Sequence, residues 1–360
     1  SLKDKFYMEI ALKLANSRQG LTGTNPSVGC VTVKNDKIVS IGQTSYNGRP
    51  HAEFNAIENC IDDLNGSKMY VTLEPCCHHG LTPPCTNIII KSKISEVIYS
   101  VSDIDKRVRN KSLKILKSNK IKVKKGLLDD KINNFYSNYF FNRKNQLPYV
   151  TGKIAVSKNN LIYSKLNKKI TNRHSDKFTH LLRYKNDALM VTYKTLNNDN
   201  SKLNCRIKGF SNFSPKRIIL DNKLQTKINT YVINTANKNN TLIFYNQAKK
   251  SKILEFKNKK IQLIKSKINQ QGKFDIKAIL KKLYTHNCRN LLIEGGDSLT
   301  SHLLKNKIFN RFYLYKSPKN IPKETEYLKF NSLDVLKKNY KNKFNLNLYL
   351  GKDKITLYKN

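Results

Sequence analysis

The sequence predicts a chain of two α/β domains. A length of 360 residues suffices for two domains of ordinary size. Helix-like and strand-like runs alternate along the whole chain, and an apolar content of 39% supports a core in each half. The polar stretch NRKNQLP (142–148) ends in proline just before a new strand. We therefore divide the chain into domains of residues 1–146 and 147–360.

The first half is expected to form one α/β layer. Apolar residues at helical spacing, β-rich runs and turn residues define its elements. These are, in order, a helix over about 4–17, two strands around a turn at 35–36, a helix over about 51–60, the strand KMYVTLEP, a helix opening at 83–84, the strand EVIYSV, a helix, the short strand IKVKKG and a helix to about 143. Such alternation predicts a largely parallel sheet.

The second half mixes the same two kinds of element. Its predicted strands are YVTGKIAVS, ALMVTYKT, KRIILD, TYVINT, TLIFYN, IQLIKS, NLLIEGG, RFYLYKSP and ITLYK. Its predicted helices are SDKFTHLLRYK, FDIKAILKKLYT and SLTSHLLKN. Tracts rich in lysine and asparagine, such as NTANKNN and EFKNKK, are predicted to be surface loops.

The net charge of +43 raises the question of nucleic-acid binding. Lysines outnumber arginines by 57 to 11 and are scattered along the chain, whereas readers of phosphates and bases favour the arginine fork. We therefore expect neither a nucleic-acid partner nor a membrane partner, since no apolar run approaches the ~18 residues of a membrane span. The N-terminal stretch lacks the apolar core of a signal peptide, so we expect a cytoplasmic protein.

The seven cysteines include a cluster in EPCCHHGLTPPC (74–85) that predicts a metal site. His51 and Glu53 open a helix upstream, and Cys76 follows a strand. The third ligand is either Cys85 or His79; the two prolines before Cys85 favour it, because they place its thiol in the first turn of a helix. A His/Cys/Cys set leaves one tetrahedral position open, which is typical of catalytic zinc. An H-x-E segment followed by Pro-Cys is typical of zinc deaminases, in which the glutamate shuttles protons. Loop cysteines without a metal are the alternative.

The segments NPSVGCVTV, HAE and EPCCHHGLTPPC resemble the deaminase domain of the bifunctional riboflavin-biosynthesis deaminase/reductases. The resemblance implies a cytidine-deaminase-like zinc domain followed by a dihydrofolate-reductase-like domain. It implies His51, Cys76 and Cys85 as zinc ligands and Glu53 as proton donor and acceptor. Asn25 is a candidate substrate contact. The implied reaction removes the 2-amino group of 2,5-diamino-6-(5-phosphoribosylamino)pyrimidin-4(3H)-one by hydrolysis. The family usually has Lys or Arg at the position of Leu81, so a cationic substrate contact is missing there.

The resemblance continues through GKIAVS, LLRYKNDALMVTYKT, NNDNSKLNCR and NLLIEGGDSLTSHLL, and implies an NADPH-dependent reduction of the ribosyl chain to a ribityl chain. The implied cofactor contacts are Val156, Thr195, Asp199, Gly295 and Gly296. The implied substrate contacts are Arg183, Leu203, Arg206 and Glu294. The resemblance to the family is weaker in this half at three places. Ser157-Lys158-Asn159-Asn160 replaces Ser-x-Asp-Gly, Lys169 replaces an aromatic residue, and Ser201 replaces a proline.

Two other functions compete with this interpretation. In one, the reductase domain survives only as a scaffold for the deaminase. In the other, the basic charge guides a nucleic-acid substrate to an editing deaminase. The long Cys-x8-Cys loop and the Glu-Gly-Gly segment argue against the second. The predicted partner is a small phosphoribosyl pyrimidine, and a homo-oligomer is left open.

Overall fold

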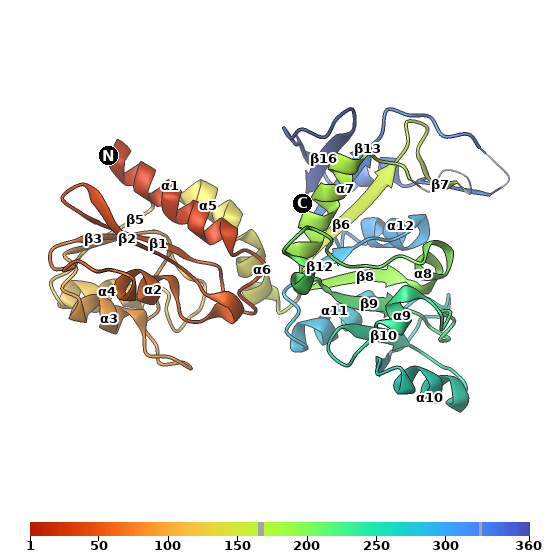
Figure 1. Cartoon of the computed structure of the whole chain (residues 1–360), viewed down its shortest axis with the longest axis horizontal. Coiled ribbons are helices and arrows are strands. Elements are labelled where there is room, and N and C mark those ends of the chain that lie inside the picture. Colours follow the sequence, from red (N-terminus) through yellow and green to blue (C-terminus); the bar gives the residue numbers. More distant parts are fainter. Residues whose placement is uncertain (165–168, 324–325) are drawn as a thin grey trace. The chain divides into compact units, whose positions relative to one another are not determined.

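The computed structural model describes residues 1–164, 169–323 and 326–360. The chain divides into two compact units, Ser1–Leu147 and Pro148–Asn360, and each is described by itself (Figure 1). No helix of the described segments is long and apolar enough to cross a membrane.

The first unit is built on one five-stranded sheet in the order β2-β1-β3-β4-β5. The strands are β1 (Gly29–Lys34), β2 (Lys37–Gln43), β3 (Lys68–Leu73), β4 (Glu96–Val101) and β5 (Lys122–Lys125). The pairs β3–β4 and β4–β5 are parallel, whereas β1 is antiparallel to both of its neighbours, β2 and β3, so the sheet is mixed and the expectation of a largely parallel sheet is wrong. The reason is the predicted two-residue turn: Asn35 and Asp36 both have positive φ, and such a tight hairpin makes β1 and β2 antiparallel.

Helices cover both faces of this sheet. They are α1 (Leu2–Ser17), α2 (Ala52–Glu58), α3 (Cys85–Lys91), α4 (Lys111–Ser118), α5 (Asp129–Phe135) and α6 (Ser137–Asn145), with a short 3-10 turn at Tyr46–Gly48. Figure 1 shows α1 and α5 on one face and α2, α3 and α4 on the other. The helix predicted to end near 143 is broken at Tyr136, whose buried hydroxyl donates to the Ser27 carbonyl at 2.9 Å.

A glycine sets the depth at which α2 packs on the sheet. A Cβ atom on Gly42 of β2 would lie 2.1 Å from the Ala52 carbonyl oxygen, so only glycine permits this approach. Ala52 is the first residue of α2, next to the predicted ligand His51. Close packing at Gly42 therefore positions the predicted metal ligand against the sheet.

The second unit is built on a nine-stranded sheet in the order β11-β10-β9-β8-β12-β6-β13-β16-β15. Its strands are β6 (Tyr149–Val156), β8 (Ala188–Thr192), β9 (Lys216–Leu220), β10 (Thr241–Tyr245), β11 (Gln262–Lys265), β12 (Asn290–Ile293), β13 (Arg311–Lys316), β15 (Asn342–Asn345) and β16 (Lys354–Lys359). Neighbours from β11 to β13 are parallel, while β13, β16 and β15 are antiparallel. A separate ribbon pairs β7 (Leu161–Ser164) with β14 (Tyr327–Lys329).

The helices of the second unit confirm the three predicted ones and add others. They are α7 (Arg173–Tyr184), α8 (Tyr193–Asp199), α9 (Tyr231–Asn234), α10 (Lys250–Asn258), α11 (Ile276–Thr285), α12 (Asp297–Lys305) and α13 (Leu333–Asn339), with a 3-10 turn at Ser211–Phe213. Residues 193–195, expected at the end of a strand, begin α8 instead.

Two predictions in the second unit are wrong for identifiable reasons. The run TYVINT forms α9 rather than a strand, with Val232 and Ile233 buried; periodicity cannot separate the two structures in so short an apolar run. The tract EFKNKK was expected in a loop, but residues 255–258 end α10. Phe256 is fully buried there and Ile253 partly buried, three residues apart on one face, amid lysines that masked the pattern.

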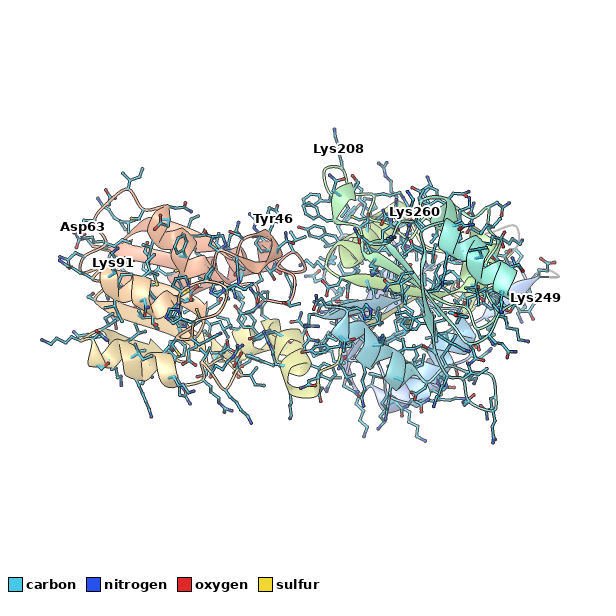
Figure 2. The ribbon with its side chains drawn as sticks, turned by 90° about the horizontal axis from the view of Figure 1, so that it is seen from below. Tyr46, Asp63, Lys91, Lys208, Lys249 and Lys260 are labelled. Atoms are coloured by element: carbon cyan, nitrogen blue, oxygen red, sulfur yellow. The ribbon has the colours of Figure 1, made fainter. Side chains whose placement is uncertain are left out.

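Four of the labelled exposed residues in Figure 2 are lysines, and they come from both units. In the second unit, Lys208, Lys249 and Lys260 are all exposed and project from separate loops (Figure 2). In the first unit, exposed Lys91 ends α3.

Candidate functional site

Three elements of the first unit bring the predicted metal ligands together. His51 caps α2, Cys85 is the first residue of α3, and Cys76 lies in the loop after β3. The Nδ1 atom of His51 is 3.5 Å from the Cys76 Sγ and 3.4 Å from the Cys85 Sγ. All three ligand atoms lie within 4.8 Å of one another. The alternative ligand His79 is exposed and lies outside this cluster.

The spacing of these atoms fits a zinc ion. With Zn–S near 2.3 Å and Zn–N near 2.05 Å, tetrahedral geometry places a sulfur and a nitrogen ligand about 3.6 Å apart. The observed separations of 3.5 and 3.4 Å are close to this value. The backbone N–H of Cys85 also donates to the Cys76 Sγ at 3.3 Å, an orientation that stabilises a thiolate. The cluster is therefore suited to hold zinc with one coordination position open.

The cysteines of the cluster differ in their protonation. A hydrogen bond from Cys85 lowers the pKa of Cys76 to about 4; burial opposes this shift and His51 adds to it. The pKa of Cys85 is raised, first by its hydrogen bond to Cys76 and then by burial. Cys76 is consequently the first thiolate, which is the form that binds metals.

Glu53 lies in the first turn of α2 and lines the same cavity as the two ligands His51 and Cys76. Its side chain is buried, and burial raises its pKa to about 7, although the charge of His51 acts to lower it. A carboxyl group that titrates near neutrality is suited to take up and release a proton. Glu53 therefore has the placement and the acidity of a general acid–base.

The cavity above the cluster has a volume of about 100 Å³. Asn25 lines it, and its amide donates to the Gly48 carbonyl at 2.9 Å, which fixes the turn before the ligand histidine. Sequence reasoning missed Glu74, whose buried carboxylate accepts from the backbone N–H of Asp103 and from the hydroxyl of Ser112. These partners lie 29 and 38 residues away, and no local signal pointed to them.

We expect Cys85→Ser to weaken zinc binding by on the order of 100-fold or more, because the hydroxyl does not replace the thiolate ligand. Metal analysis of the purified protein after dialysis would measure the loss. Cys77→Ser is the matched control: the Cys77 thiol contacts the Arg107 carbonyl oxygen at 3.5 Å and is not part of the cluster. Equal zinc content in the two variants would contradict the ligand assignment.

In the second unit a large cavity of about 1240 Å³ gathers five of the predicted reductase residues. They are Thr195, Asp199, Glu294, Gly295 and Gly296. Gly296 caps α12, and a Cβ atom added to it would meet nothing within 4 Å, so the backbone there is open to a ligand. A nine-residue helix beginning at this turn suits a phosphate at its N-terminus. The cavity and the turn thus fit a dinucleotide such as NADPH.

The remaining predicted reductase residues occupy different surroundings. Val156 and Leu203 are both buried. The side chain of Arg206 is exposed and donates to the Asn204 amide oxygen at 3.0 Å. Arg183 does not line the cavity but is paired with Glu294, which does.

Arg183 and Glu294 form a largely buried ion pair at this site. Its two parallel hydrogen bonds are both 2.8 Å long, and the side chains are only 11% and 15% exposed. Burial alone would raise the pKa of Glu294, but the charge and hydrogen bonds of Arg183 lower it to about 2. Glu294 therefore faces the cavity as a carboxylate, a permanent hydrogen-bond acceptor.

The altered turn between β6 and β7 keeps a defined geometry. Asn160 has a φ of +63°, a conformation that asparagine tolerates better than other residues with a side chain. The amide of Asn159 accepts from the Ser157 hydroxyl at 2.7 Å and donates to the Ile321 carbonyl at 2.8 Å. Lys169, the other notable departure, forms an ion pair with Asp176 at 2.9 Å. The side chains of Asn159 and Lys169 thus have partners of their own.

Asn160→Ala is expected to lower the free energy of unfolding by about 1 kcal/mol, because alanine is strained at positive φ. Asn160→Gly should not lower it, since glycine adopts this conformation freely. Urea unfolding of both variants would measure the difference. Equal loss in the two would show that the asparagine side chain, and not the backbone, stabilises this turn.

The zinc-ligand cluster and its buried carboxylate define the first unit as a zinc-dependent deaminase of the cytidine deaminase class. The nine-stranded sheet and its dinucleotide-sized cavity define the second unit as a reductase of dihydrofolate-reductase-like fold. Comparison with known proteins agrees for both units. Residues 1–101 match the cytidine and deoxycytidylate deaminase zinc-binding region. Residues 152–337 match the RibD C-terminal domain.

Relatives align along nearly the whole chain. The riboflavin biosynthesis protein RibD of Aquifex aeolicus is 33% identical over 318 residues, 88% of this chain and 87% of the relative. RibD of Actinobacillus pleuropneumoniae is 34% identical, over 89% and 85% of the two chains. The crystal structure of a diaminohydroxyphosphoribosylaminopyrimidine deaminase/5-amino-6-(5-phosphoribosylamino)uracil reductase from Thermotoga maritima superposes with a TM-score of 0.82 at 27% identity, covering 99% and 98%.

The chain belongs to the RibD family of riboflavin biosynthesis. It is a bifunctional enzyme with a zinc-dependent deaminase domain and an NADPH-dependent reductase domain. Both halves of the chain are matched, so the two competing interpretations, a deaminase with a scaffold domain and a nucleic-acid editing enzyme, gain no support.

Proposed function

We propose that the chain converts 2,5-diamino-6-(5-phosphoribosylamino)pyrimidin-4(3H)-one into 5-amino-6-(5-phosphoribitylamino)uracil in two steps. Residues 1–146 carry out the deamination and residues 147–360 the reduction. The observation that carries the proposal is the cluster of His51, Cys76 and Cys85 with the buried carboxyl of Glu53 in one cavity. The similar Thermotoga maritima protein is a diaminohydroxyphosphoribosylaminopyrimidine deaminase/5-amino-6-(5-phosphoribosylamino)uracil reductase, which supports the choice of substrate.

In the first step, water replaces the 2-amino group of the pyrimidine, and ammonia leaves. Zinc, when bound by His51, Cys76 and Cys85, lowers the pKa of water and so supplies a nucleophile at neutral pH. Glu53 takes the proton of the attacking water, which its pKa of about 7 allows. It delivers that proton to the ring nitrogen, and the remaining proton of the added hydroxyl passes to the amine, which leaves as ammonia while the carbonyl forms. Asn25 borders the cavity and holds the turn that precedes His51.

In the second step, the ring-opened imine form of the ribosyl chain accepts a hydride at C1′ and a proton at the imine nitrogen, and so becomes a ribityl chain. NADPH supplies that hydride, and the protein orients the two reactants. The turn at Gly295 and Gly296 would hold a phosphate of the cofactor at the start of α12, with Thr195 and Asp199 on the same cavity. Glu294, kept ionised by Arg183, would accept a hydrogen bond from the substrate.

Mass spectrometry of the products tests both steps at once. The zinc-loaded protein is incubated with the diaminopyrimidinone phosphoriboside, with and without NADPH. Replacing the amino group by oxygen raises the mass by about 1 Da, and the reduction adds about 2 Da. We expect both changes with NADPH and only the first without it. A product that is deaminated but not reduced would contradict the second step, and unchanged substrate would contradict both.

A further inference from the structure

The phosphate of the proposed substrate requires a cationic partner, and three arginines line the deaminase cavity: Arg49, Arg107 and Arg143. Arg107 already donates three hydrogen bonds of 2.6–3.2 Å to the carboxylate of Asp105. Arg143 lies over the ring of Tyr139 at 5.5 Å, and its charge acts against the rise that burial causes in the pKa of Asp103. Two of the three guanidinium groups are therefore engaged with protein groups.

Arg49 is engaged differently. It forms no ion pair with an acidic group among the described residues, and its Nη1 donates a hydrogen bond to the hydroxyl of Thr82. Its remaining N–H groups are available at the wall of the cavity. Arg49 also lies two residues before His51, so its place relative to the zinc ligands is fixed by a short piece of chain.

The loop that contains His78 and Gly80 lies beside the Arg49 guanidinium, and His78, Gly80 and Arg49 all line the cavity. A Cβ atom on Gly80 would lie 3.5 Å from the Arg49 Nη2 and 3.9 Å from the His78 Nε2, so both polar groups face the space beside this glycine. The Nδ1 atom of His78 is buried and has no hydrogen-bond partner within the described chain. Leu81, in contrast, is 90% exposed and offers no charge.

We propose that Arg49 binds the phosphate of the deaminase substrate and thereby makes the deaminase selective for phosphorylated pyrimidines. The planar guanidinium offers parallel N–H donors that match phosphate oxygens. Arg49 supplies from the His51 side of the cavity the cation that the loop lacks at Leu81. This assignment rests on the proposed function, because it presumes a phosphoribosyl substrate.

The test compares Arg49→Gln with the unmodified enzyme on two substrates, the phosphoriboside and the same compound without phosphate. For the phosphoriboside we expect KM to rise about 10- to 100-fold, with kcat changed less than about threefold. For the dephosphorylated compound both proteins should have the same KM. Arg109→Gln is the charge-matched control, since Arg109 is exposed and does not line the cavity. Leu81→Lys, added to Arg49→Gln, should restore part of the affinity for the phosphoriboside.

The kinetic results distinguish failure of the phosphate contact from failure of the proposed function. A KM that rises equally for both substrates would overturn the phosphate contact and make Arg49 a positioning residue for the loop. An unchanged KM for the phosphoriboside would also overturn it. If the unmodified enzyme deaminates neither compound, the proposed function itself fails. Zinc content measured for every variant separates these results from loss of the metal site.

Discussion

Glu53→Gln is expected to lower kcat for deamination by about 10²- to 10⁴-fold while leaving zinc binding and NADPH-dependent reduction unchanged. Glutamine keeps the size of the side chain but cannot take up a proton. The buried position of Glu53 and its pKa of about 7 make it the proton carrier of the cavity. Because Glu53 is outside the cluster of ligand atoms that fits zinc, its replacement removes acid–base chemistry without removing a ligand.

Release of ammonia measures this prediction, and metal analysis of the same preparation shows that zinc is retained. Glu58→Gln is the matched control, since Glu58 is exposed on the same helix, α2, and does not line the cavity. Reduction of the separately supplied deaminated intermediate should proceed at the normal rate. A variant that keeps more than a tenth of the normal kcat would show that another group carries the proton.

The metal site was predictable because its chemistry is concentrated in short segments. Cys76 and Cys85 are nine residues apart in the sequence, and the two prolines before Cys85 indicate that α3 begins there. His51 and Glu53 stand at a helix start whose apolar pattern is clear. Between Cys85 and His79 the residues alone left a choice, which depended on where the loop after β3 turns back.

Features that depend on distant contacts could not be predicted. The placement of Arg49 beside Thr82 joins segments 33 residues apart, and the pairing of Arg183 with Glu294 spans 111 residues. Resemblance suggested that both members of the latter pair contact substrate, and only the structure shows that they bind each other. The prediction of a strand at α9 is wrong for a related reason. Packing of the buried Val232 and Ile233, rather than propensity, decides the conformation of this segment.

Glu294→Gln is expected to lower the free energy of unfolding of the second unit by about 3–5 kcal/mol at pH 7, because Arg183 would keep a buried charge without a counter-charge. Urea unfolding followed by circular dichroism measures the loss, and hydrogen exchange at β12 and α7 assigns it to this unit. Glu255→Gln is the control. Glu255 pairs with Lys252 at 3.3 Å, but both side chains are more than 40% exposed, so less than about 1 kcal/mol should be lost.

The pH dependence distinguishes this ion pair from simple packing. The pKa of Glu294 is lowered from its ordinary 4.5 to about 2, so the pair contributes its full stability above pH 4.5 and loses it as the pH falls toward 2. Glutamine does not titrate, so the gap between the unmodified enzyme and Glu294→Gln should narrow over this range. A gap that stays constant would mean that the variant disturbs packing rather than charge. A narrowing gap would establish that Arg183 keeps Glu294 ionised at neutral pH, which is the state in which it can accept a hydrogen bond from a substrate hydroxyl.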